Sequence, residues 1–371
     1  MFFHIADQHQ ENYPCHWHMG SFRVSTDSGW QLRQIGTAQV LYKGYADAAP
    51  VENLLLDIVL QTIPQILGNF CAIVLADDAL TIQTDRYRSF PIYINDHSVN
   101  NLIPTEHTAW TDSLITVHSD LSVTENKFNV IGHAWLPTST VDQIDQLLTD
   151  KIKRFAEHNQ LPLRVFLSGG VDTLLLYSYI RRLDIPHEMT WNLHTDLDEF
   201  YLANSYDIKK HWGYCQIHHW QQSCVLASGA PGDEFMLRSP TTANQYLLKN
   251  GTSIPRLLAN NLDCLHHTYF TKHLDLFRGQ QAATAPELCN TVVNDWQHWH
   301  LGNTLTWTPF RDLELFKLFL ALPYEQAVAQ IMNSAVSCEL IERNVPGLTR
   351  VLSDQKNTGN AMRNLRGLLN P

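Results

Sequence analysis

The sequence predicts a mixed α/β chain: an α+β front part rich in strands, followed by an α/β part built on a parallel sheet. Two observations indicate this division. Up to about residue 135, short apolar segments alternate with turns, and beyond it apolar strands alternate with glycine turns and helical segments. The length of 371 residues also suits two domains. We therefore place the domains at 1–135 and 136–371.

The composition is that of a folded, acidic protein. Hydrophobic residues make up 44% of the chain and the formal net charge is −11, which excludes a disordered protein and disfavours nonspecific binding to nucleic acid. The 7 cysteines are scattered without a CxxC pair, so neither a disulfide framework nor a zinc ribbon is indicated. No apolar run reaches the ~18 residues of a membrane span, and we expect a cytoplasmic protein without a membrane partner.

In the front part, strands are predicted at 70–76 and 80–84, with a helix at about 51–60 before them. The second part should open with a helix after Thr140, because Thr140 and Gln143 have the spacing of a capping box. The apolar positions that follow with helical period are Val141, Ile144, Leu147, Leu148, Ile152 and Phe155.

After that helix, strands and helices alternate, which indicates βαβ units and a parallel sheet. The expected strands are 164–167, 189–193, 215–220 and 225–227, the expected helices begin near 174 and 200, and from 253 the pattern is mainly helical. A ligand crevice is expected at the carboxyl ends of the strands.

A glycine turn between the first of these strands and its helix carries the clearest chemical signal, Ser168-Gly169-Gly170-Val171-Asp172-Thr173. The glycines let the backbone approach a polyphosphate, and the hydroxyls of Ser168 and Thr173 add donors. Asp172 would repel phosphate unless a cation lies between them, which argues for Mg²⁺. A tight turn with Asp172 as a helix cap remains the alternative. A GxxxxGK[ST] loop is absent, so a kinase or GTPase has no support.

A second acidic, glycine-flanked turn, Ser228-Gly229-Ala230-Pro231-Gly232-Asp233-Glu234, follows another apolar strand. Turns that follow neighbouring parallel strands lie at one edge of a sheet. We therefore expect Asp172 and Asp233 to meet around one metal–nucleotide complex.

These motifs resemble a known family. SGGVDT is similar to the pyrophosphate loop SGGxDS of N-type ATP pyrophosphatases (PP-loop enzymes), and SGAPGDEF resembles the corresponding loop of the asparagine synthetase branch, which includes β-lactam synthetase and lasso-peptide cyclases. Further similar segments, in order, are 198–203, 211–213, 308–312 and 354–356. The resemblance spans about residues 140–360.

The resemblance implies a PP-loop domain in which ATP activates a carboxylate as an acyl-adenylate, pyrophosphate leaves, and an amine attacks to form an amide. The substrates would be a small-molecule or peptide carboxylate and amine; a homodimer or a pathway partner protein is left open. Asp172 and Asp233 would bind Mg²⁺ and, with Lys356, form the catalytic set; a surface lysine without a role is the alternative for Lys356. The residues expected at the nucleotide are Ser168, Gly169, Gly170, Val171, Asp172, Thr173, Gly229, Gly232, Asp233 and Glu234.

One position departs from the family. Amide-forming members have a glutamate four residues before the proline of the 308–312 turn, and here that position is Leu305, which cannot accept a proton. Glu234, Asp312 and Glu339 are the candidates for a replacement base, and a nucleophile that needs no base is the alternative.

The front part resembles the glutaminase domain of the same family, an Ntn-hydrolase-like fold, at 68–75 and 84–93. An active glutaminase needs an N-terminal cysteine, whereas Phe2 follows Met1 and the first cysteine is Cys15. We therefore expect a degenerate front domain that does not hydrolyse glutamine.

Two other functions stay open: an inactive nucleotide-binding or regulatory homologue, and a PP-loop enzyme that acts on a nucleic-acid base. Two of the 19 histidines lie close together in the segment Cys15-His16-Trp17-His18. Structural zinc is not favoured there, because i, i+2 histidines rarely complete a site without further ligands at fixed spacing.

Overall fold

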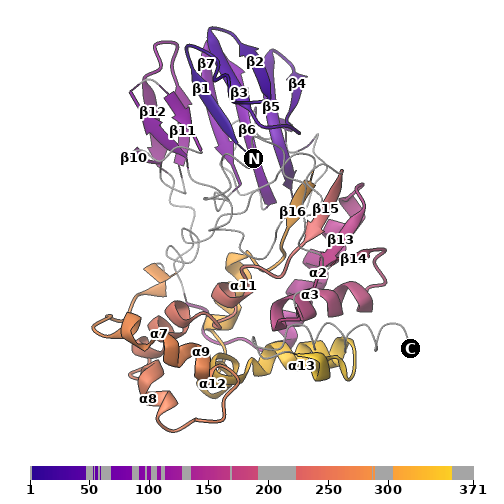
Figure 1. The fold of residues 1–371 in the computed structure, drawn as a ribbon, viewed down its shortest axis with the longest axis vertical. Helices are drawn as coiled ribbons and strands as arrows, with labels where there is room; N and C mark the ends of the chain where they lie inside the picture. Colours follow the sequence, from indigo (N-terminus) through magenta and orange to yellow (C-terminus); the bar gives the residue numbers. More distant parts are fainter. Residues whose placement is uncertain are drawn as a thin grey trace.

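The computed structural model describes residues 2–46, 53, 55, 56, 59, 68–85, 92–96, 98–101, 107–109, 113–127, 135–167, 169–190, 223–285, 287–288 and 304–352. This part of the chain forms two antiparallel sheets, one parallel sheet and a set of helices, so the fold is mixed α/β. Figure 1 shows the antiparallel strands at one end of the molecule, most of the helices at the other, and the parallel strands between them.

Both antiparallel sheets are six-stranded and come from the front part of the chain. The first has the order β10-β8-β9-β1-β3-β2, formed by β1 (Phe3–Ala6), β2 (Cys15–Met19), β3 (Phe22–Thr26), β8 (Tyr93–Asn95), β9 (Ser98–Asn100) and β10 (His107–Thr108). The second has the order β12-β11-β7-β6-β5-β4, formed by β4 (Gln31–Ile35), β5 (Ala38–Ala46), β6 (Gly68–Ala76), β7 (Ala79–Thr84), β11 (Ser113–Val117) and β12 (Val123–Lys127).

The strand β6 explains how these sheets pack. Its residues Cys71 and Ile73 belong to a core shared with the first sheet, whereas Ala72 and Val74 belong to a second core that includes Leu55. A strand buried on both faces reads as a continuous apolar run, which is the pattern that predicted this strand. The predicted strands at 70–76 and 80–84 are confirmed as β6 and β7.

The parallel sheet has the order β14-β13-β15-β16 and consists of β13 (Leu163–Phe166), β14 (Glu188–Thr190), β15 (Cys224–Ala227) and β16 (Thr304–Trp307). The sequence predicted the parallel sheet and three of these strands. It missed β16, because the four residues of this strand, Thr-Leu-Thr-Trp, are too few to display the alternation of a strand.

Helices form most of the rest of the described chain after residue 135. They are α2 (Val141–His158), α3 (Val171–Arg182), α6 (Gly232–Phe235), α7 (Pro240–Lys249), α8 (Ile254–Leu258), α9 (His267–Lys272), α11 (Leu313–Leu320), α12 (Tyr324–Asn333) and α13 (Ala335–Asn344), with 3-10 turns η1 (Leu274–Phe277) and η2 (Leu348–Val351).

The helix α2 begins where its capping box predicts. The Thr140 side chain accepts the backbone N–H of Gln143, and the Gln143 side chain accepts the N–H of Thr140, so two unpaired donors of the first turn are satisfied. Of the predicted apolar positions, Val141, Ile144, Leu148, Ile152 and Phe155 are buried, and Leu147 is partly buried.

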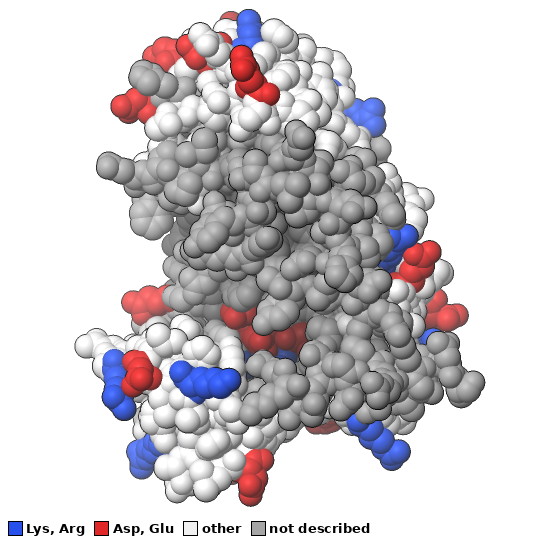
Figure 2. All heavy atoms as spheres, viewed as in Figure 1, with Lys and Arg blue, Asp and Glu red and all other residues white. Residues whose placement is uncertain are grey.

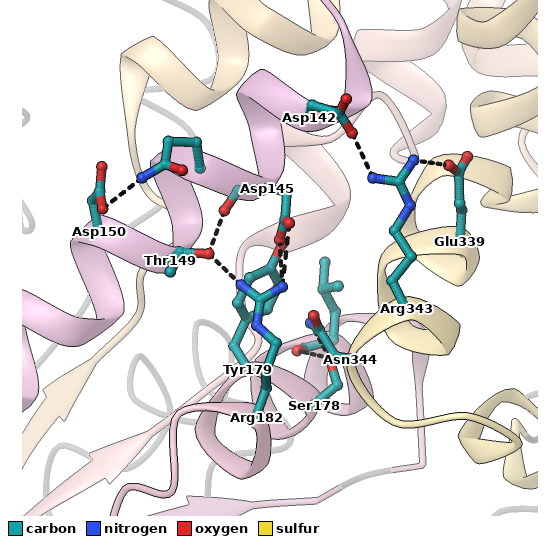
Figure 3. Close-up of polar contacts among 12 residues, drawn as sticks. Asp142, Asp145, Thr149, Asp150, Ser178, Tyr179, Arg182, Glu339, Arg343 and Asn344 are labelled. Atoms are coloured by element: carbon teal, nitrogen blue, oxygen red, sulfur yellow. Dashed lines mark hydrogen bonds and ion pairs between the residues drawn. The ribbon is translucent and has the colours of Figure 1, made fainter.

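Polar contacts tie α2 to α3 and α13, as Figure 3 shows. Asp145 of α2 accepts hydrogen bonds from Tyr179 at 2.7 Å and Arg182 at 3.0 Å, both on α3. Arg343 of α13 reaches Asp142 of α2 at 2.6 Å. These contacts hold the C-terminal part of α3, and with it the helix that begins at the first glycine turn, against α2.

The cores of the two parts of the chain are mostly separate. The core of the parallel sheet and its helices contains Tyr45 from the front part, and the core between the antiparallel sheets contains Phe166 and Leu226 from the parallel sheet. The division at 135/136 itself stays a prediction.

Several expected elements lie outside the described residues: most of the helix at 51–60, the helix near 200, the strand at 215–220 and the segment 354–356. Asn53, Leu55, Leu56 and Val59 are helical.

Among the described residues, Cys15, Cys71, Cys224, Cys264 and Cys338 are free thiols. A search of the same residues finds no helix of the length and apolarity that crossing a membrane demands.

Candidate functional site

The two acidic turns follow β13 and β15, which are neighbours in the parallel sheet. β14, the next strand along the chain after β13, lies on the opposite side of β13 from β15. After β13 the chain therefore forms β14 on one side of that strand, and it later forms β15 on the other side of β13. This arrangement is a topological switch point, the place where open parallel sheets bind ligands at the carboxyl ends of their strands.

The first turn requires its glycines. Gly169 has a φ of +81°, a left-handed conformation that side chains rarely adopt. Gly170 is the N-cap of α3 with extended backbone and, as a glycine, has no side chain with which to cap the helix. The hydroxyl of Thr173 donates to the carbonyl of Gly170 at 3.0 Å, and Val171 is buried in the core, so Val171 offers the turn only its backbone.

The second turn lies directly on the first. A Cβ atom on Gly229 would be 2.6 Å from the backbone N of Thr173 and 2.7 Å from the carbonyl C of Asp172. A Cβ atom on Gly232 would be 2.5 Å from Cγ of Asp172. Both glycines are therefore required by a close approach of backbone to backbone and of backbone to carboxylate, and the two acidic turns form one site.

Arg238 joins the two carboxylates. Its guanidinium makes an ion pair with Oδ1 of Asp172 and another with Oδ1 of Asp233 at 3.2 Å. The Arg238 side chain is 6% exposed, Asp172 17% and Asp233 39%, so the cation is buried beneath two carboxylates that still reach solvent. The backbone N–H groups of Arg238 and Ser239 donate hydrogen bonds to the carbonyl of Asp233, at 2.7 and 2.8 Å, and these bonds bring the arginine back beneath the turn.

The protonation of Asp172 sets the charge of this site. Burial and the neighbouring Asp233 raise the pKa of Asp172 to about 8, against the opposing effect of Arg238. Behind Arg238, its Nε donates to the hydroxyl of Ser334 at 2.9 Å, and Nε2 of His266 lies 2.9 Å from the same hydroxyl. Burial, and to a smaller extent the positive charge of Arg238, lowers the pKa of His266 to about 4, so this ring is neutral at pH 7.

Arg238 was missed by the sequence analysis. It follows Asp233 by five residues, and only the single helical turn of α6 brings it back onto that aspartate. Such a spacing has no recognisable pattern in the sequence.

The candidate bases differ in their surroundings. Asp312 is 2% exposed, forms an ion pair with Lys151 at 2.8 Å and caps α11 by accepting the N–H groups of Glu314 and Leu315. It is therefore a helix cap whose oxygens are occupied and whose pKa is lowered, because Lys151 and the backbone donors outweigh burial, and this makes Asp312 the less suited of the candidate bases.

Glu339 lies on α13, where it accepts a hydrogen bond from Arg343 four residues later, so it belongs to a helix-surface ion pair. Glu234 lies in α6 beside Asp233, at the candidate site. Leu305 lies in β16, paired with Val225 of β15, and is partly buried against the core. Ser168 and Lys356 lie outside the described residues.

The third turn of this edge, 308–312, follows β16 and contacts the front part of the chain. Arg311 is 3.7 Å from Asp85, the residue that follows β7, and both side chains are buried.

Figure 2 shows the described acidic and basic side chains of one face; the basic ones are dispersed and several lie beside acidic ones.

Comparisons with known proteins identify no family. No family model matches the chain, and no curated protein matches it. Among solved structures, two similar chains are an allosteric regulatory enzyme of purine biosynthesis and the glutamine phosphoribosylpyrophosphate amidotransferase from B. subtilis in complex with ADP and GMP. Each is 7% identical, with a TM-score of 0.23, over 68% of this chain and 73% of the other. A likeness this distant carries no argument about function.

Proposed function

We propose that this chain is an ATP-dependent amide synthetase of the PP-loop type, which adenylates a carboxylate, releases pyrophosphate and transfers the acyl group to an amine. The observation that carries the proposal is the meeting of two acidic glycine turns, with Asp172 and Asp233 side by side on Arg238, at the switch point of a parallel sheet.

The donor set is compatible with magnesium bound together with a polyphosphate. Mg²⁺ in phosphate-transferring sites is bound through one or two carboxylates, with phosphates and water completing its shell. Asp172 and Asp233 supply two such carboxylates, and no group of three or more metal-ligating side chains that could hold an ion is found in the described part of the chain. The pair therefore suits an ion that the nucleotide helps to bind. When bound, this ion would neutralise charge on the phosphates.

The chain's own residues would orient the nucleotide. The helix α3 begins at Gly170, and backbone N–H groups at a helix N-terminus favour anions. The glycines at 169, 170, 229 and 232 keep side chains out of the approach to these groups. With Asp312 and Glu339 engaged elsewhere, Glu234 is the remaining candidate to accept the proton of the amine, and Leu305 contributes only an apolar wall.

The front domain would act as a scaffold in this proposal. Residue 2 is a phenylalanine that is 1% exposed, and its backbone N–H donates to Asp27 at 2.9 Å. A buried aromatic ring at this place offers no nucleophile, so ammonia from glutamine is not part of the proposed reaction.

A second candidate function rests on Arg238. A buried guanidinium that already pairs with both carboxylates could replace the metal permanently, which would leave a nucleotide-binding or regulatory protein without catalysis. The two candidates differ in whether pyrophosphate exchange occurs.

The test is ATP–pyrophosphate exchange with a panel of carboxylates, with and without Mg²⁺, alongside ATP binding by calorimetry. Exchange that requires Mg²⁺ and is lost in Asp172→Ala supports the synthetase. The matched control is Asp150→Ala, an exposed carboxylate on α2 whose loss should leave exchange unchanged. ATP binding without exchange supports the second candidate, and absence of ATP binding refutes both.

A further inference from the structure

Two residues with left-handed backbone meet at the side chain of Arg238. Leu237, which precedes the arginine, is buried and has a φ of +58°. Ser334, which accepts a hydrogen bond from the guanidinium, has a φ of +54°. Left-handed backbone at residues other than glycine costs free energy, and it is retained where the surrounding structure imposes it. The fold therefore tolerates strain at the two positions that determine where Arg238 lies.

The turn between α12 and α13 holds the segment of Arg238 at two points. Nε2 of Gln330, in α12, donates to the carbonyl of Met236 at 3.0 Å. Nε of Arg238 donates to the hydroxyl of Ser334 at 2.9 Å. The side chains of Gln330 and Ser334 are buried. Since Nε lies in the plane of the guanidinium, the bond to Ser334 fixes the rotation of that plane.

The hydroxyl of Ser334 is itself oriented by His266. A guanidinium only donates hydrogen bonds, so Ser334 accepts from Arg238 and retains its own O–H for donation. Nε2 of His266 lies 2.9 Å from the same oxygen and is the acceptor for that proton. This direction requires a neutral ring whose proton is on Nδ1. Burial, and to a smaller extent the charge of Arg238, lowers the pKa of His266, which favours the neutral form.

Backbone bonds hold His266 against the same turn. Its N–H donates to the carbonyl of Met332 at 3.2 Å, and the N–H of Leu265 donates to the side chain of Asn333 at 2.9 Å. The imidazole also contacts the ring of Phe270 in α9, with 5.5 Å between the ring centroids. The acceptor of the Ser334 hydroxyl therefore has a defined place of its own.

We propose that His266 and Ser334 are positioning residues for the candidate site. They fix the guanidinium of Arg238, so that its Nη1 and Nη2 groups hold Asp172 and Asp233 at the separation that suits one magnesium–nucleotide complex. Neither residue contacts the nucleotide in this proposal. The effect on nucleotide binding rests on the proposed function, whereas the fixing of Arg238 does not.

The first measurement follows the Nε–H of Arg238 by NMR, in the full chain with isotope-labelled arginine and without nucleotide. The signal is assigned by its loss in Arg238→Lys. Its exchange with water should be at least about tenfold faster in Ser334→Gly, because glycine tolerates the left-handed backbone and lacks the hydroxyl. Exchange should also be faster in His266→Leu. It should stay slow in His266→Gln, whose amide oxygen can accept the proton of Ser334.

The second measurement is calorimetry of ATP binding at a series of Mg²⁺ concentrations. Ser334→Gly and His266→Leu should weaken Mg²⁺-dependent ATP binding at least about tenfold, as loss of an outer partner does at metal sites, and His266→Gln should retain it. The matched controls are Ser178→Ala and His187→Leu, which remove a buried hydroxyl and a partly buried imidazole with other partners. They should leave both readouts unchanged. Circular dichroism confirms that each variant is folded.

Three results would overturn the proposal. The first is unchanged Nε–H exchange in both Ser334→Gly and His266→Leu. The second is exchange in His266→Gln that is as fast as in His266→Leu. The third is faster exchange with unchanged Mg²⁺-dependent ATP binding, because Arg238 would then be fixed without positioning the carboxylates. Absence of ATP binding in the wild-type chain refutes the proposed function, and the exchange rates then still decide whether His266 and Ser334 fix Arg238.

Discussion

The replacement of Arg238 by methionine tests whether the two carboxylates of the candidate site depend on one buried cation. Arg238 is 6% exposed and pairs with both Asp172 and Asp233. Methionine preserves much of its length and its apolar packing but removes the charge. At pH 8.5, above the raised pKa of Asp172, both carboxylates of the wild-type chain are ionised. In the variant, Asp172 must either take up a proton or repel Asp233, and two like charges about 4 Å apart repel by about 4 kcal/mol at an effective dielectric constant of 20.

The variant should therefore lose about 3–5 kcal/mol of unfolding free energy at pH 8.5, the usual cost of breaking a buried ion pair. The loss should shrink toward pH 6. Without Arg238 the folded-state pKa of Asp172 rises further above its unfolded value, so the stability linked to its protonated form is present at low pH and is lost as the pH rises.

Urea denaturation of both proteins from pH 6 to 9 measures this difference, and the double variant Arg238→Met/Asp172→Asn provides the sign test. Removal of this carboxylate should stabilise the Arg238→Met background at pH 8.5 by more than it changes the stability of the wild-type background, where Arg238 compensates the charge. A loss below about 1 kcal/mol at pH 8.5, or a loss that grows on acidification, would refute the reasoning.

Two further predictions concern the frame of the site. Gly229→Ala should destabilise the chain by about 1–3 kcal/mol in urea denaturation, because its Cβ would lie 2.6 Å from the backbone of Thr173; an unchanged midpoint would show that the turns are not in contact. Lys151→Met should cost about 3–5 kcal/mol because it leaves Asp312 buried without its cation. In the wild-type chain, the stabilisation from the Lys151–Asp312 pair should be lost only at acid pH, as the pH falls through the lowered pKa of Asp312. The difference in unfolding free energy between Lys151→Met and the wild type should therefore shrink at low pH, and an unchanged difference there would contradict this.

The sequence predicted the features of the fold that local chemistry determines. The capping box at Thr140 and Gln143 predicted the start of α2, because both partners of the motif lie within one turn of helix. The apolar run at 70–76 predicted β6. The meeting of the turns that contain Asp172 and Asp233 was also predicted, since it follows from their positions after parallel strands.

The parts that were missed depend on contacts between distant segments or on short irregular turns. Arg238 becomes the partner of Asp172 only through folding over 66 residues of sequence. His9 lies beside His16 and His18 because the segment before β2 folds back onto that strand, whereas the sequence displays only the i, i+2 pair of His16 and His18. No spacing rule describes either arrangement.

The manner in which Arg238 is anchored bears on how a magnesium ion would be accommodated. Its Nε donates to Ser334, the left-handed residue between α12 and α13, and Ser334 also contacts His266. Displacement of the guanidinium would leave this buried hydroxyl without its donor and a buried charge without its partners, at a cost of several kcal/mol. We therefore expect Mg²⁺ to bind with Arg238 in place, on the solvent side of Asp172 and Asp233. Two carboxylates, one guanidinium and one divalent ion then sum to a single positive charge. Without the metal, the raised pKa of Asp172 keeps this carboxyl mostly protonated at pH 7, so that Asp233 and Arg238 leave no net charge. The edge would therefore attract a polyphosphate more strongly when the metal is bound, which makes the proposed nucleotide binding dependent on magnesium.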